Sequence, residues 1–448
     1  MKMAVIGAGI VGLTTGAGFA DLGHTVHCVD NDTRKIAQLA RGIIPNYEPG
    51  LEALVLRNTA AGRLSFGHDP SIVLNEAELV FLAVETPTGE DGEMSLAALW
   101  AIIDQLEAWS PTDDRRKMIA IRSTVPVGTT ERAENRLRGR LPAHCQVEVV
   151  SIPQFLREGS SVRDFFEPSR IVIGSSSTHV AERLTELHQR LPGPIMSTDP
   201  RSAELAKLAA NAFLAVKISF ANDMAALAEQ TGADYPAVAH SMGLDPRIGP
   251  HFISAGLGFG GSNLPKDART LVKMGDEAGA PQTLVEAAVR TNAMLPLRMV
   301  RKLEAALSDP ARRKVALLGL AFKPGTDDLR EAPSLRVIAE LNRRHPGITL
   351  TAYDPEANQA ARKLMPTGVT ICDSAEEALK GADAAILLTE WREFRQIMAE
   401  DFKNWMNRPI IMDGRNALDS TALNAQGVVC IGVGRLPVVP KEPIRNPG

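Results

Sequence analysis

Residues 3–13 read MAVIGAGIVGL: a short apolar run, then three glycines spaced G-x-G-x-x-G, within a run of small apolar residues. This order of strand, glycine turn and helix is typical of the first unit of a dinucleotide-binding α/β domain. A second apolar run, Thr25–Val29, ends at Asp30, which lies 18 residues after Gly12. A carboxylate there accepts hydrogen bonds from ribose hydroxyls and repels a 2′-phosphate. The segment therefore predicts binding of NAD rather than NADP.

Each glycine of this turn has a distinct expected role. Gly7 permits the tight turn, Gly9 lets backbone N–H groups approach a pyrophosphate, and Gly12 allows the helix to pack closely on the strand. Ile10 and Val11 stand at the start of the predicted helix, whose N-terminus supplies positive potential for phosphates.

Further apolar runs alternate with helical stretches along the chain. They are Leu79–Val84, Lys117–Arg122 and Val147–Val150, and later Lys314–Leu318, Thr349–Tyr353, Ala384–Thr389 and residues 410–412. Such alternation predicts doubly wound parallel sheets. Between the two series, Ala203–Gln230 has a long helical periodicity, and Gly232 is a plausible stop. We therefore expect an α/β protein with two Rossmann-like, doubly wound parallel-sheet domains joined by a long central helix region.

The overall composition excludes several classes of protein. A length of 448 residues suits two or three domains, and 44% hydrophobic with 23% charged residues is ordinary for a globular chain. The net charge of -4 argues against a general nucleic-acid binder, and no apolar run is long enough to span a membrane. The four cysteines, Cys28, Cys145, Cys372 and Cys430, are far apart. This pattern predicts no disulfide framework and favours the reducing cytoplasm.

An enzyme that binds NAD can oxidise an alcohol by transferring a hydride to the cofactor. The reaction needs an acceptor for the hydroxyl proton and support for the developing alkoxide. Lys207 and Asn211 lie four residues apart on the predicted long helix and share a face, while Lys266 and Asp267 follow the glycine-rich segment Gly256–Ser262. Spacing alone does not distinguish these four residues from ordinary surface positions. The nine histidines show no metal-ligand spacing, and no G-x-S-x-G elbow is present, so we expect no metal site.

Ten blocks of sequence together resemble the UDP-glucose/GDP-mannose dehydrogenase family, in that family's order, from residue 1 to about residue 430. They are Val5–Gly12, Tyr47–Leu51, Val84 with Thr86 and Pro87, Ser123–Pro126, Phe155–Gly159, Lys207 with Ala209–Phe213, Gly258–Ser262 with Pro265–Asp267, Gly319–Lys323, Asp327–Glu331, and Asp413–Arg415. The resemblance implies an NAD-binding domain over 1–195, a central helical dimerisation domain over 196–300 and a nucleotide-sugar-binding domain over 301–448. It also implies an NAD-dependent oxidoreductase acting on an alcohol of a nucleotide sugar, as a homodimer, with no nucleic-acid or membrane partner.

The resemblance further implies a set of site residues. Besides the glycine turn and Asp30, those expected to contact NAD are Lys35, Thr86, Thr124, Glu158, Lys266 and Arg330. Those expected to bind the nucleotide sugar are Gln154, Phe155, Leu156, Lys207, Asn211, Arg247, Phe252, Gly260, Phe322, Lys323 and Arg415. Lys207, Asn211, Asp267 and Thr124, with position 263, are expected to hold the reacting carbon and its water.

Two positions depart from the family pattern. Enzymes of this family oxidise a sugar alcohol twice, to a carboxylate, and a cysteine thiolate after the Gly-Gly-Ser sequence attacks the intermediate aldehyde. Here that position is Asn263, and the block that usually reads Asn-Pro-Glu-Phe carries Gln154, which cannot accept a proton at neutral pH. Both changes affect the second oxidation. We hypothesise a two-electron alcohol oxidation that releases an aldehyde or ketone, or a transient oxidation that ends in epimerisation.

Two other functions remain open at this stage. Full four-electron oxidation through a hydrated aldehyde needs no thiol and would use Asp267 as base. A catalytically silent nucleotide-sugar-binding protein is the second. A hydroxyacid or 6-phosphogluconate-type dehydrogenase shares the first turn but should lack a second α/β domain bearing Phe322, Lys323 and Arg415. The segment Arg330–Leu335 favours UDP over GDP.

Overall fold

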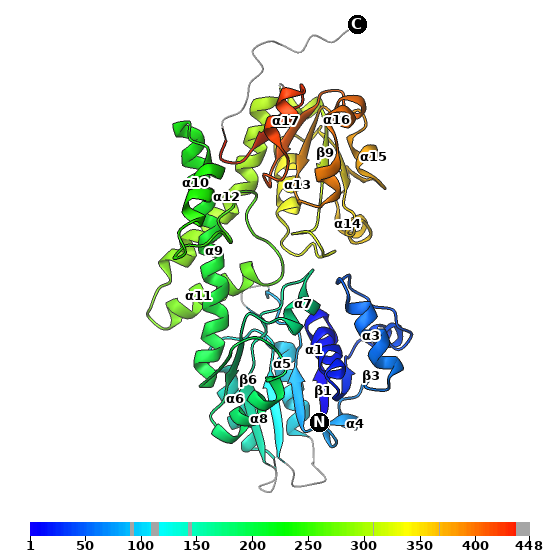
Figure 1. The fold of residues 1–448 in the computed structure, drawn as a ribbon, viewed down its shortest axis with the longest axis vertical. Helices are drawn as coiled ribbons and strands as arrows, with labels where there is room; N and C mark the ends of the chain where they lie inside the picture. Colours follow the sequence, from blue (N-terminus) through cyan, green and yellow to red (C-terminus); the bar gives the residue numbers. More distant parts are fainter. Residues whose placement is uncertain (90–93, 109–115, 142–145, 308, 367, 436–448) are drawn as a thin grey trace. The chain divides into compact units, whose positions relative to one another are not determined.

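The computed structural model describes residues 1–89, 94–108, 116–141, 146–307, 309–366 and 368–435 (Figure 1). The chain divides into two compact units. Unit 1 comprises Met1–Asn211 and Arg269–Ala280, and unit 2 comprises Ala212–Ala268 and Pro281–Gly448. Cys145, which is expected just before a strand, lies outside the described residues.

Unit 1 is built on an eight-stranded sheet in the order β3-β2-β1-β4-β5-β6-β7-β8. Its strands are β1 Lys2–Ile6, β2 Thr25–Val29, β3 Leu64–Gly67, β4 Leu79–Leu82, β5 Lys117–Ile121, β6 Val147–Ser151, β7 Ile171–Gly174 and β8 Ile195–Thr198. The first six strands run parallel. β7 instead pairs antiparallel with β6, through Ser151 and Gly174, and β8 runs parallel to β7.

Unit 2 carries a six-stranded sheet in the order β11-β10-β9-β12-β13-β14, with every pair parallel. Its strands are β9 Lys314–Leu318, β10 Thr349–Tyr353, β11 Val369–Ile371, β12 Ala384–Leu387, β13 Ile410–Asp413 and β14 Val429–Gly432. The expectation of two Rossmann-like parallel-sheet domains is therefore confirmed. The strands that the sequence pattern did not predict are β3, β7, β8, β11 and β14.

Helices cover both faces of the first sheet. They are α1 Ile10–Asp21, α2 Thr33–Leu39, α3 Leu51–Ala60, α4 Ser71–Leu74, α5 Ala97–Glu107, α6 Thr129–Arg138, α7 Ser161–Phe166 and α8 Thr178–His188. One apolar cluster packs α1, α3 and α8 against β1 and β4, and a second packs α5 and α6 against alternate residues of the same strands. The alternation follows from strand geometry, since successive side chains point to opposite faces.

The predicted long helix is confirmed as α9, Pro200–Thr231, and Gly232 follows it with a φ of 79°. The helices after it are α10 Tyr235–Gly243, α11 Leu264–Glu277 and α12 Thr283–Ala306. Around the second sheet lie α13 Pro333–Arg344, α14 Asn358–Leu364, α15 Ala375–Leu379, α16 Ala399–Trp405 and α17 Ser420–Ala425, with the short helices η1 Pro310–Arg312 and η2 Glu393–Gln396. Among the described residues, no helix is both long and apolar enough to cross a membrane.

His188 is buried in the core of unit 1. The ring of His188 meets that of Phe19 edge to face at 5.5 Å, and its Nδ1 lies 2.7 Å from the carbonyl oxygen of Leu184. Burial lowers the pKa of His188 from 6.5 to about 4. Between these values the unfolded chain binds more protons than the folded one. The free energy of unfolding should therefore fall as the pH falls from 6.5 towards 4.

We expect His188→Leu to remove this contribution. Chemical denaturation measures the free energy of unfolding at neutral pH and at a pH near the folded-state pKa of His188. The decrease in this free energy between the two pH values should be smaller by about 3 kcal/mol in the variant than in the parent protein. His179→Leu, at an exposed position of the same helix, is the control and should keep the parent's pH dependence. An unchanged pH dependence in His188→Leu would contradict the assignment.

Candidate functional site

The glycine turn of unit 1 brings α1 into direct contact with the end of β1. A Cβ on Gly12 would lie 1.7 Å from the carbonyl oxygen of Gly7, and a Cβ on Gly7 would lie 2.6 Å from that of Ala83. Gly7 also has a φ of +102°, where side chains are strained. Both positions therefore require glycine, as the sequence pattern predicts.

Gly9 differs from the other two because a Cβ there would meet no atom within 4 Å. It is the N-cap of α1, and no side chain caps this helix. The first N–H groups of a helix lack partners within the helix, and its N-terminus attracts anions. The open space at Gly9 and the uncapped turn at Ile10 and Val11 fit the pyrophosphate of a dinucleotide.

Asp30 stands beside this turn, after β2. Its Oδ2 accepts hydrogen bonds from the Ala8 N–H at 2.8 Å and from Lys35 Nζ at 2.9 Å, and its Oδ1 accepts one from the Asp32 N–H at 3.0 Å. Burial alone would raise the pKa of Asp30, but these donors outweigh it and hold the pKa below its usual value. The carboxylate is thus ionised at neutral pH, which suits ribose hydroxyls. The structure places Lys35, which is expected to contact NAD, directly against it.

Two buried threonines lie after β4 and β5, at the same sheet edge. Thr86 Oγ1 donates to the carbonyl oxygen of Thr124 at 3.0 Å, and Ser123 Oγ donates to that of Val84 at 2.6 Å. The loops after the two strands are therefore fastened to each other. Ligands of parallel sheets bind at this carboxyl edge, so Thr86 and Thr124 lie at an edge that suits a ligand.

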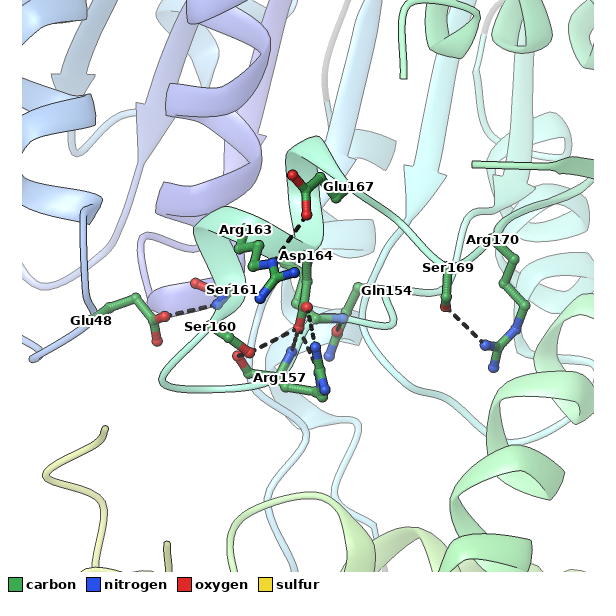
Figure 2. A network of polar contacts seen from close by, with 11 residues as sticks. Glu48, Gln154, Arg157, Ser160, Ser161, Arg163, Asp164, Glu167, Ser169 and Arg170 are labelled. Atoms are coloured by element: carbon green, nitrogen blue, oxygen red, sulfur yellow. Dashed lines mark hydrogen bonds and ion pairs between the residues drawn. The ribbon is translucent and has the colours of Figure 1, made fainter. Parts of the chain in front are cut away.

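The loop after β6 carries Gln154, Phe155, Leu156 and Glu158. Figure 2 shows how polar contacts hold it from several sides. Gln154 Oε1 accepts the Leu156 N–H at 2.6 Å, which fixes the first residues of the loop. Asp164, on α7, accepts hydrogen bonds from the backbone N–H, Nε and Nη2 of Arg157.

Glu48 fastens the far end of the same loop (Figure 2). Its Oε2 accepts the Gly159 N–H at 2.7 Å and its Oε1 accepts the Ser161 N–H at 2.8 Å. Ser161 Oγ also shares a 2.9 Å hydrogen bond with Thr14 Oγ1 of α1. The loop is thereby tied to the helix that follows the dinucleotide turn. Sequence reasoning assigned no role to Glu48, although it stands in the matching block Tyr47–Leu51.

Lys207 and Asn211 are buried on α9, contrary to the surface position that spacing alone allows. Lys207 Nζ lies 5.2 Å from the centre of the Phe155 ring, so the loop after β6 and α9 meet here. The guanidinium of Arg170 lies 3.7 Å from the same ring. A buried cation beside an aromatic face can support negative charge developing on a substrate oxygen.

Glu204, one turn before Lys207, positions this part of α9. Its carboxylate accepts hydrogen bonds from the Gly128 N–H at 2.6 Å, the Thr130 N–H at 2.8 Å and Thr130 Oγ1 at 2.6 Å. It therefore caps α6 and links α9 to the loop that contains Thr124. Burial raises the pKa of Glu204 although these donors oppose the shift. No sequence motif indicated this residue, because its partners lie more than 70 positions away.

In unit 2, the largely buried side chain of Arg415 joins three segments. Its Nε donates to the Leu388 carbonyl oxygen at 2.7 Å, Nη1 to that of Gly258 at 3.1 Å and Nη2 to that of Phe322 at 3.3 Å. Burial lowers the pKa of Arg415, opposed by the nearby Glu390. Arg415 therefore fixes the glycine-rich loop against the turn after β9. Close packing continues there, since a Cβ on Gly261 would lie 2.7 Å from the Phe322 ring.

Asn263 lies at the N-terminus of α11. Its carbonyl oxygen accepts the Asp267 N–H at 2.8 Å, the first hydrogen bond of that helix. Asp267 is fully buried, and its Oδ1 accepts a 2.9 Å hydrogen bond from Lys266 Nζ. The two adjacent residues thus form a buried ion pair directly after the glycine-rich loop.

Other predicted substrate and cofactor residues of unit 2 lie at its surface. The Arg247 side chain is 87% exposed and pairs with Asp245, and Arg330 pairs with Asp328. Phe252 is exposed and has a φ of 64°. Gly260 packs closely instead, because a Cβ there would lie 2.4 Å from the Glu331 carbonyl oxygen. Among the described residues, no cluster of possible metal ligands is present.

We expect Glu48→Gln to loosen the loop after β6. The amide retains one acceptor oxygen but presents an NH₂ group to a backbone N–H, so one charge-assisted hydrogen bond is lost. Such a bond contributes about 1.5–3 kcal/mol, which corresponds to amide exchange about 10- to 100-fold faster at Gly159 and Ser161. Hydrogen–deuterium exchange by mass spectrometry measures this effect. The control is Glu167→Gln, which removes an exposed ion pair with Arg163, and equal exchange in both variants would contradict the role of Glu48.

Comparison with known proteins identifies the family. Models of the UDP-glucose/GDP-mannose dehydrogenase family match in three parts: the NAD binding domain at residues 1–192, the central domain at 201–294 and the UDP binding domain at 316–420. The UDP-glucose 6-dehydrogenase of Pseudomonas aeruginosa is 43% identical, over 97% of this chain and 98% of its own. UDP-glucose 6-dehydrogenase YwqF of Bacillus subtilis is 40% identical, over 99% and 100%.

A solved structure agrees with these sequence relatives. The UDP-glucose dehydrogenase of Pyrobaculum islandicum is 34% identical and superposes with a TM-score of 0.88, covering 97% of this chain and 98% of its own. The match extends over both units and over the dinucleotide turn. The chain therefore belongs to the UDP-glucose/GDP-mannose dehydrogenase family and is an oxidoreductase that uses NAD.

Proposed function

We propose that this enzyme oxidises an alcohol of a UDP-sugar by two electrons, without a covalent intermediate on the protein. The carbon loses a hydride and the hydroxyl group loses a proton, so that an alcohol becomes an aldehyde or ketone. Release of this carbonyl, or its reduction again to an epimer, completes the reaction. The observation that carries the proposal is the residue at the N-terminus of α11, which is Asn263.

Position 263 is well suited to a reactive thiol. A helix N-terminus lowers the pKa of a cysteine and so favours the nucleophilic thiolate. An asparagine amide has no comparable nucleophile, and asparagine is a favourable residue at a helix N-terminus in its own right. Asn263 therefore retains the local structure while it removes the covalent route to a carboxylate.

The described cysteines offer no substitute thiol. Burial raises the pKa of Cys28 to about 12 and, together with the nearby Asp413 carboxylate, raises the pKa of Cys430 to about 12. Cys372 is also buried, and its pKa is raised as well. A thiol with so high a pKa is protonated at neutral pH and does not attack an aldehyde.

Gln154 supports the same conclusion, because it bears on the hydrolysis step that would follow formation of a thioester. Hydrolysis of a thioester requires a base to activate water, and a neutral amide does not accept a proton. The Oε1 atom of Gln154 is in any case engaged with the Leu156 N–H. The residue thus shapes the loop after β6, and it does not replace a general base.

The remaining groups have roles in the first oxidation. Bound NAD⁺ supplies the hydride acceptor. Lys207 would support the alkoxide as the hydroxyl proton departs, and Asn211 would orient the sugar by hydrogen bonds. Asp267 would accept the proton, and Thr124 is assigned to the same reaction. Gln154, Phe155, Leu156, Arg247, Phe252, Gly260, Phe322, Lys323 and Arg415 are assigned to the nucleotide sugar, and Lys35, Thr86, Glu158, Lys266 and Arg330 to NAD.

Two features favour UDP as the nucleotide. The model that matches residues 316–420 describes a UDP binding domain, and the relatives named above act on UDP-glucose. We assign NAD binding to residues 1–195, dimerisation to 196–300 and nucleotide-sugar binding to 301–448. The identity of the sugar and of the oxidised carbon follows from the experiment below.

The test is the number of NADH molecules formed per sugar consumed across a panel of UDP-sugars. We expect one NADH per sugar, or an epimer with no net NADH, because the second oxidation lacks its nucleophile. Two NADH with a uronate product would show that a hydrated aldehyde serves instead. Tight binding of NAD and UDP without turnover of any sugar would equally overturn the proposal.

A double variant tests whether the residues at positions 263 and 154 are the reason that the reaction stops after one oxidation. Asn263→Cys combined with Gln154→Glu should form uronate and two NADH per sugar, because a thiolate and a base are both restored. Asn263→Ser with Gln154→Glu is the matched control and should still stop at one NADH. If both double variants form uronate equally, the thiol at position 263 is not the determinant.

We also propose that the enzyme is a homodimer formed through α9. Phe213, Phe220 and Leu227 are spaced seven residues apart, so they lie on one face of the helix, and their side chains are 64%, 47% and 54% exposed. Large apolar side chains in a row are characteristic of a protein interface. A second copy of this chain is the partner that the family resemblance implies.

Phe220→Glu should therefore separate the subunits. Burying a charge at the centre of an apolar interface should raise the dimer dissociation constant about 100-fold or more. Sedimentation equilibrium measures this change. Leu364→Glu, at an exposed apolar position on α14, is the control and should leave the dimer intact. A dimer of unchanged affinity in Phe220→Glu would exclude this face.

A further inference from the structure

Arg122 is a buried cation directly after β5. Arg122 is only 8% exposed, and its guanidinium lies 5.8 Å from the centre of the Phe81 ring. Its backbone N–H donates to the Leu82 carbonyl oxygen at 2.9 Å, which holds it at the carboxyl edge of β4 and β5. This is the edge at which the dinucleotide turn stands. Neither the glycine pattern nor the assigned site residues include Arg122.

The charge of Arg122 has no counter-ion within the described part of the chain. No carboxylate forms an ion pair with it there, and burial lowers its pKa to about 10, so it remains protonated at neutral pH. A buried charge without a partner destabilises a folded protein, and an apolar side chain of similar size is often neutral or stabilising in its place. The cost of burying Arg122 therefore requires a compensating function.

A chain of hydrogen bonds connects Arg122 to the dinucleotide turn. Its Nε donates to Thr15 Oγ1 at 2.9 Å, and Thr15 Oγ1 donates to the carbonyl oxygen of Val11 at 2.7 Å. Val11 lies in the first turn of α1, two residues after Gly9. The cation is thus bonded to the helix whose N-terminus faces the cofactor. Its field adds to the positive potential of that N-terminus.

We propose that Arg122 is a positioning residue for the diphosphate of the cofactor, acting by its charge through the first turn of α1. The phosphates then serve as the counter-ion that the described part of the chain does not provide. At a given distance, such an interaction is stronger across a low-dielectric interior than through water. This role of Arg122 affects NAD binding only, whichever alcohol the enzyme oxidises.

The test compares ligands that differ in phosphate charge. Isothermal titration calorimetry would measure binding of adenosine, ADP and NAD to the full-length protein and to Arg122→Gln, Arg122→Met and Arg122→Lys. The glutamine variant keeps a donor for Thr15, and the methionine variant keeps the apolar packing. Lys117→Gln is the matched control, because Lys117 is a buried cation at the opposite end of the same strand, bonded to the carbonyl oxygens of Asn75 and Ala77.

We expect Arg122→Gln and Arg122→Met to weaken ADP and NAD about fivefold, in line with a charge near a helix N-terminus, while adenosine binding stays within about twofold. Arg122→Lys should restore most of the loss. The melting temperature of unliganded Arg122→Met should not fall, whereas a purely structural role predicts that it does.

Three results would overturn the proposal. One is an equal loss of affinity for adenosine and ADP in the neutral variants, which would indicate a general disturbance of the fold. Another is no loss for any ligand. The third is the same ADP-selective loss in Lys117→Gln, which would show that any buried cation of β5 produces the effect.

Discussion

The structure of unit 1 depends on the close approach of α1 to the end of β1. With 1.7 Å between a hypothetical Cβ of Gly12 and the Gly7 carbonyl oxygen, no side chain fits between helix and strand. This contact aims the helix N-terminus at the carboxyl edge of the sheet. The residues that follow β2, β4, β5 and β6 lie at this same carboxyl edge of the sheet. They include Asp30, Thr86, Thr124 and Gln154.

The second sheet repeats this architecture, but in the turn after β9 a carboxylate of the protein accepts the backbone N–H groups. Asp354 Oδ2 accepts the Leu320 N–H at 2.6 Å, the Ala321 N–H at 3.0 Å and Trp391 Nε1 at 3.0 Å. In the first unit, Asp30 takes only the Ala8 N–H of the glycine turn. The N–H groups after β9 are thus already engaged, so this turn does not offer a dinucleotide the same cradle. One scaffold therefore supports two different binding tasks.

Sequence patterns predicted the elements that have strong local signals. The strands Thr25–Val29, Lys314–Leu318 and Thr349–Tyr353 match residue for residue, because they are short segments rich in the apolar, β-branched and aromatic residues that favour strands. The reversed β7 was not predicted, since direction in a sheet depends on pairing and leaves no local trace. Lone acids such as Glu48 and Glu204 were missed for a related reason. Their partners are backbone N–H groups far away in the sequence, which any residue type can supply.

Charge chemistry links the fold to the proposed reaction. The proposed single hydride transfer rests on two residues, Asn263 and Gln154, whose amide side chains supply neither the thiolate nor the base that a covalent second oxidation requires. The most direct measurement is the mass spectrum of the product formed from a UDP-sugar substrate. The account predicts a product two hydrogens lighter than the substrate, or an epimer of equal mass. A carboxylate product formed by the unmodified enzyme would contradict it.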